Sequence, residues 1–257
     1  MSLVAVVGAT GGAGATTVVA HLASAVTQQD KPVLCLDFCP TNILRLHFGT
    51  ALAERAGFAR ALLDGTPWQD AAFTSTSGVA FLPFGTLDGD ADLDRISAWL
   101  QQRPHWLPEA LASTTLAPQT MVICDCPRLP AALRNQVLAA ADLTLVVCAP
   151  TPLALAAASH MATQLRERAG QASAVLLNGF EAGRALDRDM QLLLRRQHAN
   201  LAAPVSIHRD ESLREALAHK LTVFDYAPAS QAAQEFAALA TWVIARTVST
   251  TSAAVSA

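Results

Sequence analysis

The chain has 257 residues, of which 52% are hydrophobic and 15% charged, with a formal net charge of −3 at pH 7. This composition supplies a sizeable apolar core and argues against a disordered chain. The acidic balance, with lysine only at Lys31 and Lys220 and no run of basic residues, argues against a nucleic-acid-binding protein.

The cysteines and the N-terminus indicate a cytosolic protein. The five cysteines are odd in number and follow no disulfide or zinc-knuckle spacing, so we expect reduced, buried thiols that hold no metal. The N-terminus lacks a basic segment, and its apolar run breaks at Gly8, so it is not a secretory signal. No stretch is apolar for long enough to span a bilayer. The cysteines are Cys35, Cys39, Cys124, Cys126 and Cys148.

Short apolar runs alternate with amphipathic stretches of helical length, which is typical of repeated βα units. We therefore expect one α/β domain over residues 1–248, with a doubly wound, mostly parallel sheet and helices on both faces, and a disordered tail over residues 249–257. Prolines at 104, 108 and 118 mark loops within Thr86–Gln119. The predicted strands are Leu3–Val7, Val33–Asp37, Val79–Phe84, Met121–Asp125, Leu143–Cys148, Ser173–Asn178 and Pro204–Ile207. The predicted helices are Thr16–Val26, Ala91–Gln101, Leu129–Ala140, Leu153–Arg168, Ala185–His198, Glu211–Ala218 and Gln231–Arg246.

A glycine-rich loop follows the first predicted strand and opens directly onto a helix. It reads Gly8-Ala9-Thr10-Gly11-Gly12-Ala13-Gly14-Ala15-Thr16-Thr17. Strand, glycine loop and helix N-terminus together form a cradle for phosphate, because backbone N–H groups converge there with the positive end of the helix dipole. The P-loop pattern G-x-x-x-x-G-K-[ST] would place Gly at Ala9 and Lys at Ala15, so the loop has the expected shape without its lysine.

Two predicted strands end in aspartate. Asp37 ends the second strand, and Asp125 ends the strand Met121–Asp125 in the form of a Walker B motif. A carboxylate at this strand end, beside a P-loop, reaches a bound Mg²⁺ directly or through water. The alternative is that both aspartates only form turns before Pro40 and Pro127.

Two other polar residues, Asn178 and Asp210, each allow a structural and a binding interpretation. Asn178 ends a strand and either presents its amide to an adenine or forms an Asx-turn before Gly179. Asp210 is a good N-cap for the following helix, with a contact to a base or a partner as the alternative. Apart from His208, which lies two residues before Asp210, the histidines are expected to be structural or solvated and to form no cluster. They are His21, His47, His105, His160, His198 and His219.

These motifs together resemble the MinD/ParA class of deviant-Walker ATPases. The resemblance also includes Ala140-Ala141-Asp142 before a strand, and Ser212–Ala216 followed by Pro228–Ala233. More narrowly, the chain resembles the BcsQ family, the MinD-like proteins of bacterial cellulose-synthesis operons. The runs that carry this narrower likeness are Cys39-Pro40 with Asn42–Leu46, Phe58–Gly65 with Trp68, Leu82–Gly85 and Ile207–Glu211.

The resemblance implies a cytosolic ATP-binding protein that forms a homodimer around nucleotide. It also implies service to the cellulose synthase complex at the inner membrane, with other proteins of the same operon. The net charge argues against direct binding to DNA, and the absence of lysine from Gln231–Ala257 argues against direct binding to the membrane. By motif position, Thr16 would bind Mg²⁺, Asp37 and Asp125 would lie in the outer shell of the metal, and Asn178 would contact adenine. The phosphates would bind to Gly11, Gly12, Ala13, Gly14, Ala15, Thr16 and Thr17.

Three departures from the MinD/ParA pattern bear on hydrolysis. The signature lysine is replaced by Thr10, the Walker lysine by Ala15, and a second aspartate by Cys39. A charge-assisted hydrogen bond contributes about 1.5–3 kcal/mol, so the loss of two cations weakens triphosphate binding unless Arg45 or Arg128 replaces part of the charge. Hydrolysis depends on positioning and charge stabilisation, and we expect it to be weak or absent.

Two other functions fit parts of the pattern. An active ParA-type partitioning ATPase would require a lysine in the loop and a basic surface, and the sequence supplies neither. A nucleotide-free scaffold would keep the glycine loop only as architecture, which Ala9 and Ala15 make a serious alternative.

Overall fold

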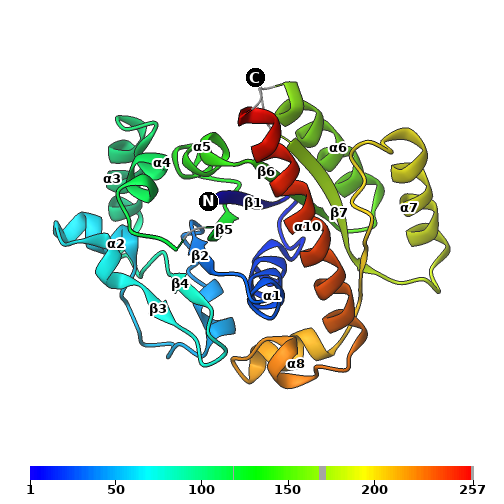
Figure 1. Cartoon of the computed structure of the whole chain (residues 1–257), viewed down its shortest axis with the longest axis horizontal. Helices are drawn as coiled ribbons and strands as arrows, with labels where there is room; N and C mark the ends of the chain where they lie inside the picture. Colours follow the sequence, from blue (N-terminus) through cyan, green and yellow to red (C-terminus); the bar gives the residue numbers. More distant parts are fainter. Residues whose placement is uncertain (118, 168–171, 256–257) are drawn as a thin grey trace.

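The computed structural model describes residues 1–117, 119–167 and 172–255. Its strands form one eight-stranded sheet in the order β3-β4-β2-β5-β1-β6-β7-β8 (Figure 1). Every pairing among the described strands is parallel except that of β3 with β4, at one edge. The strands are β1 (Ser2–Gly8), β2 (Val33–Asp37), β3 (Phe73–Thr74), β4 (Ala80–Leu82), β5 (Met121–Cys126), β6 (Leu143–Cys148), β7 (Ala172–Phe180) and β8 (Ile207–His208).

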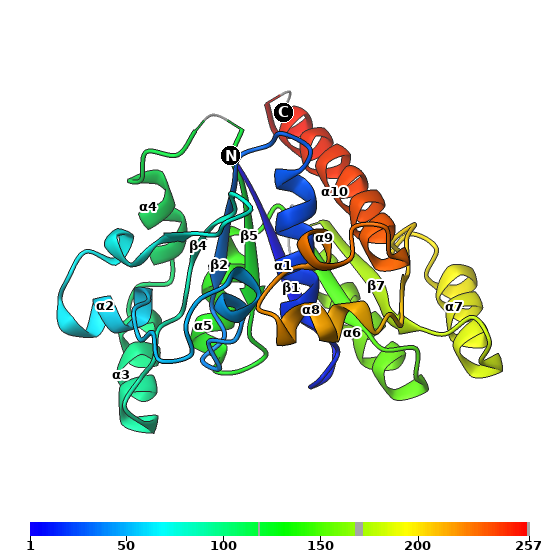
Figure 2. The same cartoon turned by 90° about the horizontal axis from the view of Figure 1, so that it is seen from below.

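Helices cover both faces of the sheet, and each face has its own apolar core. One core joins the sheet to α1 (Ala15–Thr27), α9 (Val223–Tyr226) and α10 (Gln231–Val255), with α8 (Ser212–Ala218) beside them (Figure 2). The other core includes residues of six helices: α2 (Phe58–Asp64), α3 (Asp90–Gln101), α4 (Trp106–Ala112), α5 (Ala131–Ala140), α6 (Pro152–Glu167) and α7 (Ala185–Gln197). The predicted doubly wound α/β class is therefore confirmed.

The central strands are built from apolar residues that face helices on both sides, and all residues of β2, β5 and β6 are buried. Such strands read as continuous apolar runs rather than as alternating patterns. This is why their predicted bounds match the structure to within one residue.

Most differences from the predicted elements lie between residues 44 and 112. The prolines there were expected to mark loops, but Pro108 lies in the first turn of α4, where its missing N–H group is not needed. Helix α2 is only seven residues long and ends at Gly65, whose φ is +69°. Two short 3₁₀ helices, η1 (Leu44–Phe48) and η2 (Trp68–Ala71), and β3 were also not predicted. Outside this range, α9 was not predicted, and the predicted strand Pro204–Ile207 overlaps β8 only at Ile207.

Helix α10 continues to Val255, past the start of the tail predicted at Ser249. Residues 256 and 257 of that tail, Arg168 of a predicted helix and Pro118 of a predicted loop lie outside the described residues. The division into residues 1–248 and a tail stays a prediction. Within the described chain, no helix combines the length and the apolar character that crossing a membrane would require.

Candidate functional site

The glycine loop joins the carboxyl end of the central strand to the start of α1. The amide of Ala9 donates to the carbonyl of Val147 on β6 at 2.8 Å, which fixes the point where the chain leaves the sheet. The amide of Val18 donates to the carbonyl of Gly14 at 2.9 Å, as the first turn of α1 requires. The N–H groups of the preceding residues, Ala15 to Thr17, have no acceptor within the helix, so this end of α1 is suited to bind an anion.

The space in front of the loop is open. A Cβ atom built on Gly11 or Gly12 would have no other atom within 4 Å, and both residues are exposed. Gly12 and Gly14 have φ angles of +73° and +88°, a backbone region that residues with a side chain adopt at a cost. The loop therefore keeps an open, glycine-dependent bend in its backbone even though Ala15 stands in place of the lysine.

Asn178, at the end region of β7, contacts the loop directly. Its Nδ2 donates to the carbonyl of Ala13 at 2.8 Å. A Cβ atom on Gly14 would lie only 2.4 Å from the same Nδ2, which gives the steric reason for glycine at this position. Strand β7 continues two residues past Asn178, which was predicted to end it, and Asn178 supports the loop. Its contact with adenine stays a prediction.

The two aspartates predicted beside a metal lie next to each other. Asp37 on β2 and Asp125 on β5 are register partners in the parallel sheet, so their side chains project on the same side. Both are buried, at 0% and 1% exposure. Oδ1 of Asp37 accepts the N–H of Cys39 at 2.9 Å. Among the described residues, Oδ2 of Asp37 and both oxygens of Asp125 have no well-formed hydrogen bond.

Burial of this pair disfavours negative charge. Desolvation, followed by repulsion from Asp125, raises the pKa of Asp37 well above its usual value. Desolvation also raises the pKa of Asp125 to about 6, although the nearby side chains of Thr16 and Cys39 oppose the rise. Two buried carboxylates, three of whose four oxygens lack a well-formed hydrogen bond among the described residues, are costly in a metal-free protein, and a bound cation would offset that cost.

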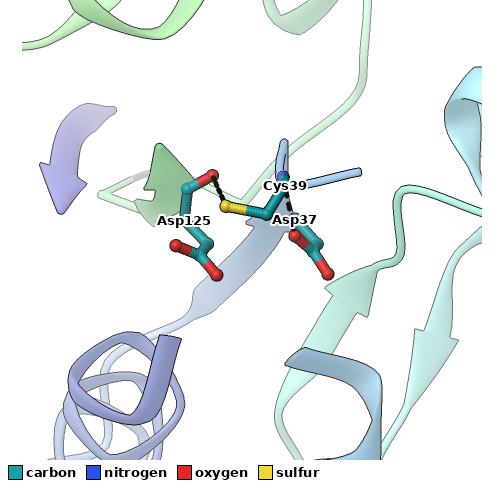
Figure 3. A group of neighbouring side chains, drawn as sticks. All are labelled: Asp37, Cys39 and Asp125. Carbon is teal, nitrogen blue, oxygen red and sulfur yellow. Dashed lines mark hydrogen bonds between the residues drawn. The ribbon is translucent and has the colours of Figure 1, made fainter. Parts of the chain in front are cut away.

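Cys39 completes this group at the end of β2 (Figure 3). One ligand atom each from Asp37, Cys39 and Asp125 can be chosen so that all three lie within 4.8 Å of one another. Desolvation, followed by repulsion from Asp125, raises the pKa of the Cys39 thiol far above its usual value, so the thiol stays neutral without a metal. The pattern of cysteine spacing could not indicate this group, because its members come from two different strands.

The residues present fit a divalent cation and a phosphate chain. The carboxylate oxygens are the hard donors that Mg²⁺ prefers. The hydroxyl of Thr16, the second residue of α1, lies beside Asp125 and offers a further oxygen. The open glycine loop and the unpaired helix amides offer donors to phosphate. The structure brings the predicted metal residues Thr16, Asp37 and Asp125 together, because Asp125 lies beside both other residues, and their binding of Mg²⁺ stays a prediction.

The two arginines considered as substitutes for lysine differ in their surroundings. Arg45 is buried and donates to the carbonyls of Ala51 and Leu52 at 2.6 and 3.0 Å, so its guanidinium holds the loop that follows η1. It lies near enough to Asp37 to lower the pKa of that carboxyl in part. Arg128 is exposed on the loop that follows β5.

Two buried histidines, His21 of α1 and His47 of η1, contact each other, contrary to the expectation that the histidines form no cluster. Nδ1 of His21 is 2.8 Å from the carbonyl of Thr17. The His21 ring stacks on Phe236 of α10 at 5.1 Å and meets His47 edge-on at 5.5 Å. Burial lowers the pKa of His21 to about 4 and that of His47 to about 3, so both rings are neutral at pH 7. The sequence carries no signal for this contact, because three separate elements supply it.

The run Ile207–Glu211 fixes the last strand to α10. The Glu235 side chain accepts the N–H of His208 at 2.8 Å and lies 2.5 Å from its Nδ1. Asp210 accepts the amides of Ser212 at 2.9 Å and of Ala232 at 3.0 Å. The sequence predicted Asp210 as the N-cap of the following helix, but the N-cap residue of α8 is Glu211. Asp210, one residue earlier, instead connects the turn before α8 to the start of α10.

Comparison with known proteins identifies a family that matches nearly the whole chain. The model of the family described as "Cellulose biosynthesis protein BcsQ" matches residues 1–244. The chain is 32% identical over 254 residues to the cellulose biosynthesis protein BcsQ of Escherichia coli (strain K12), covering 95% of this chain and 94% of that protein.

Two solved structures show the same fold at lower identity. The septum site-determining protein MinD of Pyrococcus horikoshii, complexed with Mg-ADP, is 23% identical with a TM-score of 0.75, covering 94% of this chain and 95% of that one. Cobyrinic acid a,c-diamide synthase of Mycobacterium smegmatis, with a bound ATP analog and magnesium, is 23% identical with a TM-score of 0.73 and covers 95% and 94%.

Proposed function

The chain belongs to the cellulose biosynthesis protein BcsQ family, and from this premise we propose that it is an ATP-binding accessory protein of bacterial cellulose biosynthesis. In this proposal a homodimer forms around Mg-nucleotide and assists the assembly, localisation or regulation of the cellulose synthase complex with weak or absent hydrolysis. The observation that carries it is a pair of buried aspartates beside an open glycine loop, three of whose four carboxylate oxygens lack a well-formed hydrogen bond among the described residues.

The site residues have defined roles in this proposal. Main-chain amides from Gly11 to Thr17 bind the phosphates, and the Thr16 hydroxyl binds Mg²⁺. Asp37 and Asp125 orient water molecules around the ion, which supplies the positive charge that the pair lacks. Asn178 keeps Gly14 in its left-handed conformation and offers its remaining amide oxygen to adenine.

Weak hydrolysis follows from the groups that the chain lacks. Thr10 and Ala15 supply no charge to the phosphates, and Cys39 supplies a neutral thiol where a carboxylate would orient a water molecule. Since phosphoryl transfer relies almost wholly on positioning and charge, nucleotide would remain bound for long periods and stabilise the dimer.

Exposed apolar residues after the carboxyl ends of the central strands support the binding of a second copy of the chain there. Leu129 follows β5 and Leu153 lies in the first turn of α6, after β6; they are 73% and 77% exposed. Strands β5 and β6 flank β1, so both leucines follow strands that adjoin the one leading into the glycine loop. Arg128, next to Leu129, is the exposed cation that we assign to the phosphate charge.

Sedimentation velocity tests the proposal. With Mg-ATP, the wild-type protein should sediment as a dimer, and Leu153→Ser should remain a monomer. Leu186→Ser is the matched control, because Leu186 is also exposed, at 50%, but lies on α7. A monomer under all nucleotide conditions, or equal loss of the dimer in both variants, would refute the nucleotide-dependent dimer.

The second candidate is a nucleotide-free scaffold, which the absence of lysine from the loop favours. It predicts no rise in Tm on addition of Mg-ATP, whereas a ligand that binds only the folded protein stabilises it by RT ln(1 + [L]/Kd) and raises Tm as its concentration exceeds Kd. A cellulose-producing host that carries Asp125→Asn distinguishes the two in vivo. Loss of cellulose favours the nucleotide-bound dimer, and full production favours the scaffold.

A further inference from the structure

The group formed by Asp37, Cys39 and Asp125 has a mixed donor set. Two members offer carboxylate oxygens and the third offers sulfur (Figure 3). Sulfur is a poor ligand for Mg²⁺ and a preferred one for Zn²⁺ and other borderline or soft ions. The thiol therefore gives this place a chemistry that a magnesium site does not use.

The carboxylates point to a directly bound ion. Both aspartates are buried, and among the described residues three of their four oxygens lack a well-formed hydrogen bond. We propose that the nucleotide-free protein binds a Zn²⁺-class transition-metal ion through direct bonds to Asp37, Cys39 and Asp125. This inference does not depend on the proposed function, since it concerns the chain without nucleotide.

The geometry suits such an ion after a small contraction. The ligand atoms around a tetrahedral Zn²⁺ lie about 3.3–3.8 Å apart, given bonds of about 2.0–2.3 Å. The three donors already lie within 4.8 Å of one another. Cys39 is only half-buried and lies at the end of a strand, so its side chain can approach the ion while the aspartates stay in the sheet register. A water molecule completes the fourth position.

Formation of the metal–sulfur bond is balanced by loss of the thiol proton to solvent. The ion also offsets the desolvation of the thiolate and its repulsion from Asp125, the two largest reasons that a thiolate is unfavourable here without metal. Affinity should therefore rise with pH, as expected for a site whose sulfur ligand must be deprotonated.

Cobalt tests the assignment, because Co²⁺ replaces Zn²⁺ and its bond to a thiolate gives a near-ultraviolet charge-transfer absorption. Titration of the nucleotide-free wild-type protein with Co²⁺ should produce this band with saturation at one ion per chain, and Zn²⁺ should abolish it. Cys39→Ser should lose the band and bind Zn²⁺ roughly tenfold or more weakly. Cys39→Asp should still bind the ion, without the band, which shows that the fold and the carboxylates remain intact.

Cys126→Ser is the matched control. Cys126 is a buried thiol at the end of β5, but its Sγ lies 3.9 Å from the carbonyl of Arg134, outside the group. The band should persist in this variant. Absence of the band in the wild-type protein, its persistence in Cys39→Ser, or its loss in Cys126→Ser alone would each overturn the proposal.

Discussion

Replacement of Gly14 by alanine tests how closely Asn178 supports the glycine loop. The new Cβ atom would lie 2.4 Å from Nδ2 of Asn178, well inside van der Waals contact. Asn178 must then turn away and give up its 2.8 Å hydrogen bond to the carbonyl of Ala13. In addition, alanine would have to adopt the left-handed conformation of Gly14, where φ is +88°.

The two effects add. Left-handed backbone costs about 1–2 kcal/mol for a residue with a side chain. Loss of the hydrogen bond costs about 0.5–1.5 kcal/mol. Gly14→Ala should therefore lower the free energy of unfolding by about 2–3 kcal/mol, which corresponds to a fall in Tm of about 5–10 °C for a chain of this size.

Urea denaturation of three alanine variants separates these effects. Gly12→Ala should lower the free energy of unfolding only by the cost of a left-handed backbone, since φ is +73° and nothing lies within 4 Å of its Cβ position. Gly11→Ala has neither cost and should lie within about 0.5 kcal/mol of the wild type. Introducing Asn178→Ala should reduce the cost of Gly14→Ala to that of Gly12→Ala. Equal costs for all three glycines, or no effect of Asn178→Ala on the cost of Gly14→Ala, would refute the argument.

Two further predictions concern pH. Because burial raises the pKa of Asp125 to about 6, the folded metal-free protein binds this proton more tightly than the unfolded chain, and its stability falls as the pH rises from about 4 to above 6. Asp125→Asn should thus gain up to about 3 kcal/mol at pH 8 in urea denaturation with a chelator, and a less stable variant at pH 8 would contradict this. Because burial lowers the pKa of His21 to about 4, the unfolded chain takes up that proton first and stability is lost as the pH falls from about 6.5 to about 4. His21→Phe should lose less stability over that interval in a series of Tm measurements, and an unchanged loss would count against a buried neutral histidine.

The sequence could place the two aspartates at one edge because parallel strands share their carboxyl ends. It could not supply their register, which pairs Asp37 with Asp125, nor show that three of their four oxygens lack a well-formed hydrogen bond among the described residues. The glycine loop was predictable for a similar local reason, since a strand, the glycines and the helix start are contiguous. Its support by Asn178 joins residues 165 positions apart, and no local pattern encodes that contact.

The less predictable parts depend on tertiary packing. Phe58 of α2 lies 5.8 Å from the ring of Trp106 of α4, and both short helices pack through these aromatic contacts rather than through a long amphipathic repeat. The run Ile207–Glu211 carries part of the family resemblance, and its contacts connect β8 and α10. Family-specific residues can therefore mark an unusual packing contact as readily as a binding site.

Equilibrium dialysis of the purified protein against ATP, with and without Mg²⁺, tests the central claim most directly. If main-chain amides and the helix start bind the phosphates without lysine, the wild-type protein should bind one ATP per chain saturably, only with Mg²⁺, and Thr16→Ala should lose most of that binding. If millimolar ATP and Mg²⁺ give no saturable binding, the cradle beside Asp37 and Asp125 is not a nucleotide site.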